Sequence, residues 1–195
     1  ERMGGRIDGR SVVVDTVVRG SGKNKQQFTR VTVGAPRAAS GLELRKEWAW
    51  TKVQKWLGAD DVEVADPHFD QRIHVKGDTV LALSLLGEDE RMNVLRFVDG
   101  LGGQLEQGAF RLEIPGIVAD ALKIIEPVET AVALARLMDV DTFEPEKRLA
   151  QNVLHDPLPG VRLRNFEVLR TRFAESPETR RVAALLLDGD DPALQ

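Results

Sequence analysis

The stretch VEVADPHFDQRIHVKGD, residues 62–78, decides how the rest of the chain is interpreted. Two short segments of strand composition, residues 62–65 and 72–75, flank a corner made by Asp66 and Pro67. Because proline has no amide hydrogen to donate to a sheet, the corner is expected between strands or at a sheet edge. Phe69 supplies a large apolar anchor beside it. The stretch therefore predicts a folded corner between two strands.

On the N-terminal side of this stretch, residues 5–34 have the composition of antiparallel strands. Asp8 and Gly9 form a two-residue hairpin signal that leads into a β-branched run. A glycine-rich turn at residues 19–25 then returns the chain, so a three-stranded meander is predicted. The Gly-Ser-Gly-Lys of this turn lacks the first glycine and the Ser or Thr of a phosphate loop, and it joins two strands instead of opening a helix. A short strand at 42–45 and a helix at 47–57 should follow.

On the C-terminal side, the sequence predicts two helices followed by a hairpin. Asp78 is placed to cap a helix over residues 79–86, and the acids at residues 88–90 favour the start of a second helix. The second helix is expected to have a partly apolar face that contains Met92, Leu95 and Val98. A hairpin over residues 104–114 is expected next.

A long apolar helix over residues 118–138, bent or divided at Pro127, should lead into a helical tail. In the tail, the Asp-Pro pair at residue 156 is followed by Val161 and Arg162, and a second Asp-Pro pair occurs at residue 191. This opening, followed by a pair of helices, resembles HEAT-type repeats. A lone repeat cannot bury both of its faces, so we expect either further repeats or docking of the tail on the first part.

The order of elements around the corner is similar to that of bacterial families of unknown function. Their shared pattern is an acid, Pro, any residue and Phe, then an apolar strand and a helix with paired leucines. The matching positions here are Asp66, Pro67, Phe69, Ile73, Val75, Leu85 and Leu86, with Ile73 at a position where the pattern usually has an aromatic residue. The resemblance covers residues 5 to 115 in element order. It implies an architecture but no activity, because those families have no assigned chemistry.

Composition excludes several kinds of site. The chain has no cysteine, which excludes disulfides, thiolate zinc sites, iron–sulfur clusters and cysteine nucleophiles. Residues 1–58 carry 12 Lys and Arg against 5 Asp and Glu, whereas residues 59–144 carry 7 against 18. A basic segment of this kind can bind nucleic acid. Here the cations are spread over strands and turns, and the acidic middle should fold against them, so nucleic-acid binding is not expected.

One group of residues suggests a metal site. Asp66, His68 and Asp70 alternate, so an extended backbone would direct them to one side, where His74 could join them as a fourth ligand. Against this, no standard ligand spacing is present, Pro67 bends the run, and the aspartates have simpler roles in a turn. A metal-dependent hydrolase-type enzyme that uses these four residues is the alternative function. The favoured expectation is no cofactor, no metal and no catalytic residue.

The candidate partner-binding residues are Trp48, Lys52, Lys55, Arg162 and Arg164. On a helical wheel of residues 47–57, Trp48 falls beside the two lysines and outside the core-facing arc. An indole among lysines could contact a protein partner. It could also face lipid headgroups, together with the basic hairpin tip, if a membrane anchor precedes Glu1.

The sequence therefore predicts a two-part protein. Residues 1–140 should form an α+β domain of mainly antiparallel sheet with several packed helices, and residues 141–195 a small all-α HEAT-like unit. No G-x-S-x-G, H-E-x-x-H or G-x-G-x-x-G motif is present. The favoured function is a non-catalytic scaffold or protein-interaction module, since helical repeats commonly bind partners. The expected location is cytoplasmic, with membrane association in a longer protein that carries an anchor.

Overall fold

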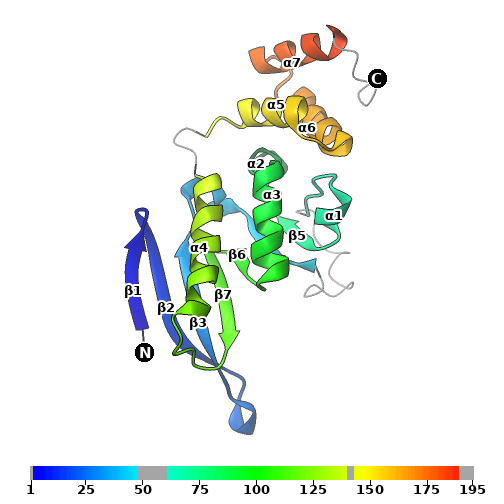
Figure 1. The fold of residues 1–195 in the computed structure, drawn as a ribbon. Helices are drawn as coiled ribbons and strands as arrows, with labels where there is room; N and C mark the ends of the chain where they lie inside the picture. Colours follow the sequence, from blue (N-terminus) through cyan, green and yellow to red (C-terminus); the bar gives the residue numbers. More distant parts are fainter. Residues whose placement is uncertain (1, 48–60, 140–142, 189–195) are drawn as a thin grey trace.

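A computed structural model describes residues 2–47, 61–139 and 143–188, which combine one antiparallel sheet with several helices (Figure 1). The sheet has seven described strands in the order β1-β2-β3-β7-β6-β4-β5. Their bounds are β1 Arg2–Ile7, β2 Arg10–Arg19, β3 Gln26–Gly34, β4 Glu43–Lys46, β5 Ile73–Lys76, β6 Gln104–Glu106 and β7 Ala109–Pro115. The predicted α+β class with an antiparallel sheet is confirmed.

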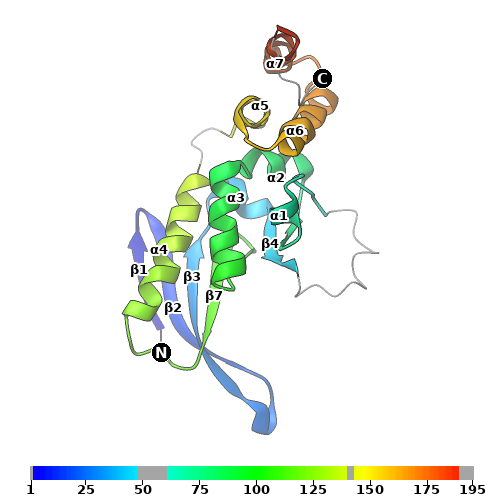
Figure 2. The ribbon, with the colours of Figure 1, turned by 45° about the vertical axis from the view of Figure 1, so that its right-hand side comes forward.

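The helices lie on one face and at one end of this sheet. Their bounds are α1 Pro67–Asp70, α2 Thr79–Leu85, α3 Glu88–Val94, α4 Leu122–Leu137, α5 Pro145–His155, α6 Pro159–Arg172 and α7 Pro177–Asp188. α3 continues into a π-helical segment, η4 (Leu95–Gly100), and short 3₁₀ turns occur at η1 (Gly22–Asn24) and η2 (Arg37–Gly41). α3 and α4 lie side by side across the sheet, and α5 to α7 lie at the end away from the β2–β3 hairpin (Figures 1 and 2). None of the described helices combines the length and the apolar character that crossing a membrane requires.

The N-terminal meander forms as predicted. Asp8 and Gly9 have φ values of 52° and 76°, the left-handed conformation that a two-residue hairpin requires. Along β3, Thr29, Val31 and Val33 are buried and alternate with half-buried residues. This alternation places one face of the sheet against the helices, and Arg30 and Thr32 of β3 lie on the opposite face, here called the polar face.

Ion pairs cover the polar face. Arg30 on β3 lies 2.6 Å from the Asp15 carboxylate on β2, and Arg19 on β2 lies 2.6 Å from Glu113 on β7. Farther along the sheet, Glu106 on β6 pairs with Arg111 at 2.6 Å. The Arg19–Glu113 pair joins the basic segment, residues 1–58, to the acidic segment, residues 59–144. The opposite charges of the two segments favour this packing.

The corner at Asp66 is helical, and the predicted strand at residues 62–65 is wrong. Asp66 caps the single turn α1, because its Oδ1 accepts hydrogen bonds from the amides of His68 (3.0 Å) and Phe69 (3.1 Å). Over the described residues 61–65, contact with the sheet backbone consists of a bridge from Asp61 to Lys76 and a hydrogen bond from the Val62 amide to the Val75 carbonyl on β5. An aspartate followed by proline is a helix-start signal, and this local capping overrides the strand composition.

One hydrophobic core runs through both predicted parts of the chain. It includes Phe69, Phe97 and Phe110 from the first part and Leu149 and Leu169 from the tail. The rings of Phe97 and Phe110 pack edge to face at 5.7 Å. α2 contacts both α5 and α6. The tail is therefore docked on the first part, which is one of the two expected arrangements.

The predictions for the cap of α2, the start of α4, the helix at residues 47–57 and the domain boundary have different outcomes. Asp78 caps α2 through a 2.9 Å hydrogen bond from the Leu81 amide, as predicted. The long apolar helix begins at Leu122 instead of residue 118 and continues through Pro127. The predicted helix at 47–57 and the predicted domain boundary near residue 140 fall mostly or entirely on residues outside the described ranges, so the helix and the division into two domains stay predictions.

Candidate functional site

The junction between the tail and the rest of the chain is organised by Arg91 on α3. Its Nε donates a hydrogen bond to Asp66 Oδ2 at 3.0 Å, and its Nη1 and Nη2 donate to the two carboxylate oxygens of Asp156 at 2.8 and 3.1 Å. Nη1 also donates to the Leu86 carbonyl at 3.1 Å. Arg91 is only 3% exposed. Burial acts to lower the pKa of Arg91, but the hydrogen bonds and charges of Asp156 and Asp66 outweigh it and raise the pKa, so the guanidinium stays charged.

The two aspartates belong to two Asp-Pro corners that are built alike. Asp66 also accepts the backbone amides at the start of α1, and Asp156 Oδ1 accepts the amide of Leu158 at 3.0 Å. Each carboxylate therefore accepts hydrogen bonds both from the backbone of its own turn and from Arg91. A bidentate contact between a guanidinium and a carboxylate defines both distance and orientation. Arg91 thus sets the position of the tail relative to the corner.

A second set of polar contacts joins the tail to the end of α2. Arg148 on α5 donates from Nε to the Ser84 carbonyl at 2.6 Å and pairs with Glu90 at 2.7 Å. Asn152, one turn farther along α5, donates to the Leu83 carbonyl at 2.9 Å. The last carbonyls of a helix have no partner within the helix. Side chains of the tail therefore complete the hydrogen bonding of α2.

A glycine allows the tail to approach the corner closely. Gly160, at the start of α6, lies so near the corner that a Cβ atom built on it would be 2.8 Å from the Ala65 carbonyl oxygen. Ala65 itself has a φ of 65°, which is uncommon for a residue other than glycine. The backbone of the corner at Ala65 therefore packs directly against the start of α6 at Gly160.

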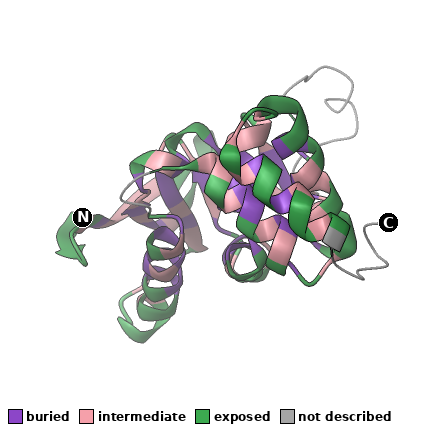
Figure 3. Cartoon of the chain, turned by 90° about the horizontal axis from the view of Figure 1, so that it is seen from above, coloured by how far each residue is buried: buried purple, intermediate pink, exposed green. Residues whose placement is uncertain are grey.

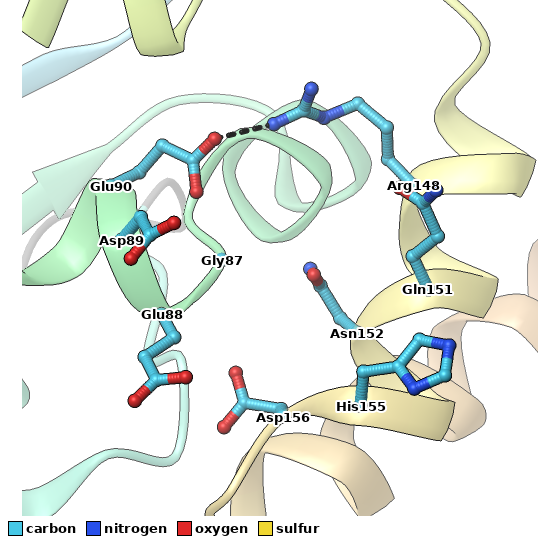
Figure 4. A pocket seen from close by; sticks show the side chains of 9 residues that line it. All are labelled: Gly87, Glu88, Asp89, Glu90, Arg148, Gln151, Asn152, His155 and Asp156. Atoms are coloured by element: carbon cyan, nitrogen blue, oxygen red, sulfur yellow. Dashed lines mark hydrogen bonds and ion pairs between the residues drawn. The ribbon is translucent and has the colours of Figure 1, made fainter.

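A pocket of about 350 Å³ opens at this junction, between the start of α3 and one side of α5 (Figure 4). Apart from Gly87, the residues that line it are polar or charged: Gly87, Glu88, Asp89, Glu90, Arg148, Gln151, Asn152, His155 and Asp156. Glu90 and Asp156 are held by arginines. Glu88 and Asp89 are exposed, and within the described part of the chain no ion pair is recorded for either. The pocket therefore has two carboxylates free to bind a cation.

The four residues of the suggested metal site are not brought together. Asp66 is occupied by Arg91, and His68 is exposed on α1. Asp70 accepts the Val64 amide at 3.0 Å, and His74 is buried on β5. The extended backbone that would align the first three is absent, because residues 67–70 form a helical turn. Over the described ranges, no group of three or more His, Asp or Glu side chains is arranged to hold a metal ion.

His74 and Asp70 line a smaller pocket of about 220 Å³. The His74 Nε2 lies 3.3 Å from the Asp61 carboxylate, and its Nδ1 lies 3.8 Å from Glu47. Burial raises the pKa of Asp70 above its ordinary value, although the hydrogen bond from the Val64 amide opposes this shift. The folded chain therefore binds the Asp70 proton more tightly than the unfolded chain does.

Replacing Asp70 with Asn should change how stability depends on pH. Because the pKa of Asp70 is raised in the folded state, its stabilising contribution is present in acid and is lost as the pH rises through that pKa. At pH 7 the charged carboxylate is unfavourable, so we expect Asp70→Asn to be at least as stable as the wild type. Urea unfolding at pH 7 and pH 3.5 measures the difference. The stability gain of Asp70→Asn over the wild type should be smaller at pH 3.5 than at pH 7. A gain that is larger at pH 3.5 would contradict the raised pKa of Asp70.

The candidate partner-binding residues are not gathered at the junction pocket. Trp48, Lys52 and Lys55 lie outside the described residues. Arg162 and Arg164 lie on α6, both half-buried, and the Arg164 guanidinium lies 3.5 Å from Glu167. Neither arginine lines the pocket. Their role in partner binding stays a prediction.

The sequence interpretation missed Arg91, Arg148 and Asn152. A signal for Arg91 exists, because it lies three and seven residues before Val94 and Val98, both fully buried, and so occupies a core position of its helix. The prediction placed Met92 on the apolar face, yet Met92 is 65% exposed. The phase of this helix is set by Val94 and its buried neighbours, which leaves Met92 facing solvent.

Comparisons with known proteins add little to this geometry. No protein-family model matches the chain, and no curated protein matches it either. Among solved structures, the chain is similar to the crystal structure of the mycobacterial trehalose monomycolate transport factor A, TtfA. The two share 12% sequence identity and a TM-score of 0.44, over 72% of this chain and 74% of that one. A likeness of this strength assigns no function, and the resemblances to corner-motif families and HEAT-type repeats stay predictions.

Proposed function

We propose that the chain is a non-catalytic protein-binding module, and that the junction pocket receives a basic side chain of its partner. The observation that carries this proposal is the pocket itself, with Glu88 and Asp89 exposed at its rim while its deeper charges are engaged in structural bonds. A pocket held open by such bonds keeps its shape when it is empty. This lowers the ordering cost of binding.

Charge determines the chemistry of the partner. The lining contains four carboxylates, of which Glu90 pairs with Arg148, and Asp156 pairs with Arg91, a guanidinium that Asp66 shares. The remaining negative charge of Glu88 and Asp89 favours a lysine or arginine. Asn152 and His155 lie across the hollow from α3 (Figure 4). Beside that cation, the Asn152 amide oxygen can accept a hydrogen bond, since its nitrogen already donates to Leu83 and Asn165, and the His155 imidazole can form another. A protein segment with a basic residue in a polar setting fits this arrangement.

The alternative of a metal-dependent hydrolase has no supporting geometry among the described residues. Asp66 and Asp70 already accept backbone amides, and Asp66 also holds Arg91. A metal ion would have to displace these bonds. We therefore retain the binding module as the proposed function.

The test uses the full chain with Glu88→Gln and Asp89→Asn combined. The control is Glu129→Gln, which neutralises an exposed carboxylate on α4, away from the pocket. In quantitative affinity enrichment from the source cells, partners should bind the wild type and the control alike. Their affinity for the double variant should fall about tenfold, equivalent to about 1.4 kcal/mol for two partly exposed charge pairs. If each bound protein is retained equally by all three chains, the pocket is not the binding site.

A further inference from the structure

β1 is the free edge of the sheet. Among the described strands it pairs with β2 alone, and all six of its residues are exposed (Figure 3). At the other edge, β5 is partly covered by a bridge from Asp61 to Lys76 and by a hydrogen bond from the Val62 amide to the Val75 carbonyl. An uncovered edge strand presents a row of amide and carbonyl groups that another strand can bind.

The hairpin turn determines which of these groups point outward. The two-residue turn at Asp8 and Gly9 makes Ile7 and Arg10 the closing hydrogen-bonded pair. Hydrogen-bonded and non-hydrogen-bonded pairs alternate along an antiparallel ladder. Ile7, Gly5 and Met3 therefore bond to β2, whereas Arg6, Gly4 and Arg2 direct their amides and carbonyls away from the sheet.

The side chains of β1 divide between two faces. Met3 is paired with Val14 and Gly5 with Val12, so Met3, Gly5 and Ile7 share the face that carries the helices. Met3 is 62% exposed and Ile7 is 43% exposed. Arg2 and Arg6 lie on the opposite, polar face. The edge thus offers two exposed apolar side chains on one face and two cations on the other.

We infer that β1 pairs antiparallel with β1 of a second copy of this chain, with Gly5 opposite Gly5. A symmetric pairing that keeps like faces together near the strand centre can be centred on Gly4 or on Gly5. Centring on Gly4 places Arg2 directly opposite Arg6 of the second copy, and like charges in that position destabilise a sheet. Centring on Gly5 places Met3 opposite Ile7 of the second copy and Arg6 opposite Gly4.

The pairing on Gly5 therefore covers the exposed apolar side chains and avoids a direct contact between cations. In this register, the outward amide and carbonyl of Gly4 in one copy pair with those of Arg6 in the other copy. The result is a sheet that continues across a twofold axis. Because the contact is only one short strand wide, the dimer should be weak and reversible. It lies apart from the junction pocket, so this inference does not depend on the proposed function.

Cysteine cross-linking tests the register, and the chain has no cysteine of its own. A Cβ atom at Gly5 meets nothing within 4 Å, and one at Gly4 meets only ordinary contacts from 3.7 Å, so both positions accept Cys. In the inferred register, a cysteine at position 5 lies opposite the cysteine at position 5 of the second copy, as a disulfide requires. A cysteine at position 4 lies opposite Arg6 of the second copy. Under mild oxidation of the full chain, we expect Gly5→Cys to form disulfide dimers about tenfold faster than Gly4→Cys. Equal rates, or faster cross-linking of Gly4→Cys, would overturn the register.

Sedimentation of the cysteine-free chain tests the dimer without a cross-link. Gly4→Pro removes an outward amide that takes no part in the β1–β2 ladder, and proline is tolerated at such edge positions. Self-association that increases with concentration is expected for the wild type and should be lost in Gly4→Pro, with circular dichroism unchanged. A wild type that stays monomeric, or a proline variant that dimerises equally well, would overturn the inference.

Discussion

Replacing Arg91 with Ala is expected to lower the free energy of unfolding by about 3–5 kcal/mol. The loss arises because the carboxylates of Asp66 and Asp156, 12% and 1% exposed, would remain buried without their cation. The Leu86 carbonyl would also lose its hydrogen bond. Since a domain is stabilised by only about 5–15 kcal/mol, this is a large fraction of the total. Urea denaturation followed by circular dichroism measures it.

Arg96→Ala is the matched control for Arg91→Ala. Arg96 continues the same helical run and pairs with Glu126 at 3.1 Å, but both side chains are at least 60% exposed. An exposed ion pair contributes about 0–1 kcal/mol, so this variant should stay close to the wild type. Adding Asp156→Asn to Arg91→Ala should restore part of the lost stability, because it removes one of the stranded charges. Equal losses at Arg91 and Arg96 would show that the buried network contributes little.

Phe69→Ala is expected to destabilise the chain by about 3–5 kcal/mol, whereas His68→Ala should change its stability by less than about 0.5 kcal/mol. The two residues are neighbours in α1, but Phe69 is fully buried in the common core and His68 is exposed. Truncation of Phe69 removes its core contacts and leaves a cavity beneath the corner.

Thermal and urea unfolding of the two variants measure this difference directly. The comparison also bears on the metal hypothesis, in which His68 is a ligand. If His68→Ala destabilised the chain as much as Phe69→Ala, the histidine would have a role that its exposed position does not explain. A small effect at His68 and a large one at Phe69 would identify the corner as a structural element of the core.

Much of the fold follows from short-range signals in the sequence. The hairpin at Asp8 and Gly9 requires left-handed backbone at two successive residues, which few residue pairs tolerate. The cap at Asp78 depends on a hydrogen bond to an amide only three residues away. Such features depend on a few neighbouring residues, so the sequence alone predicts them. The strand predicted at residues 62–65 is wrong for a reason of the same short range, because Asp66 caps the helical turn that begins at Pro67.

The candidate site could be predicted only in part. The sequence indicated a corner at Asp66, an Asp-Pro opening of the helical tail at Asp156, and a tail that must dock or extend. It did not indicate that both corners bind one arginine on a third element, because that contact depends on where separate helices come to lie. The sequence also grouped Asp66, His68 and Asp70 on one side, and the helical turn α1 separated them.

By itself, then, the sequence determined the strands of the meander, the capped start of α2, the absence of cysteine chemistry and the α+β class. These rest on hydrogen bonds and side-chain patterns within a few residues of one another. The tertiary structure alone decided that Arg91 is buried, that the tail completes the hydrogen bonds of α2, and that an acidic pocket opens between α3 and α5. A buried charge is tolerated only where its partners converge, and that convergence arises when distant segments pack into one core.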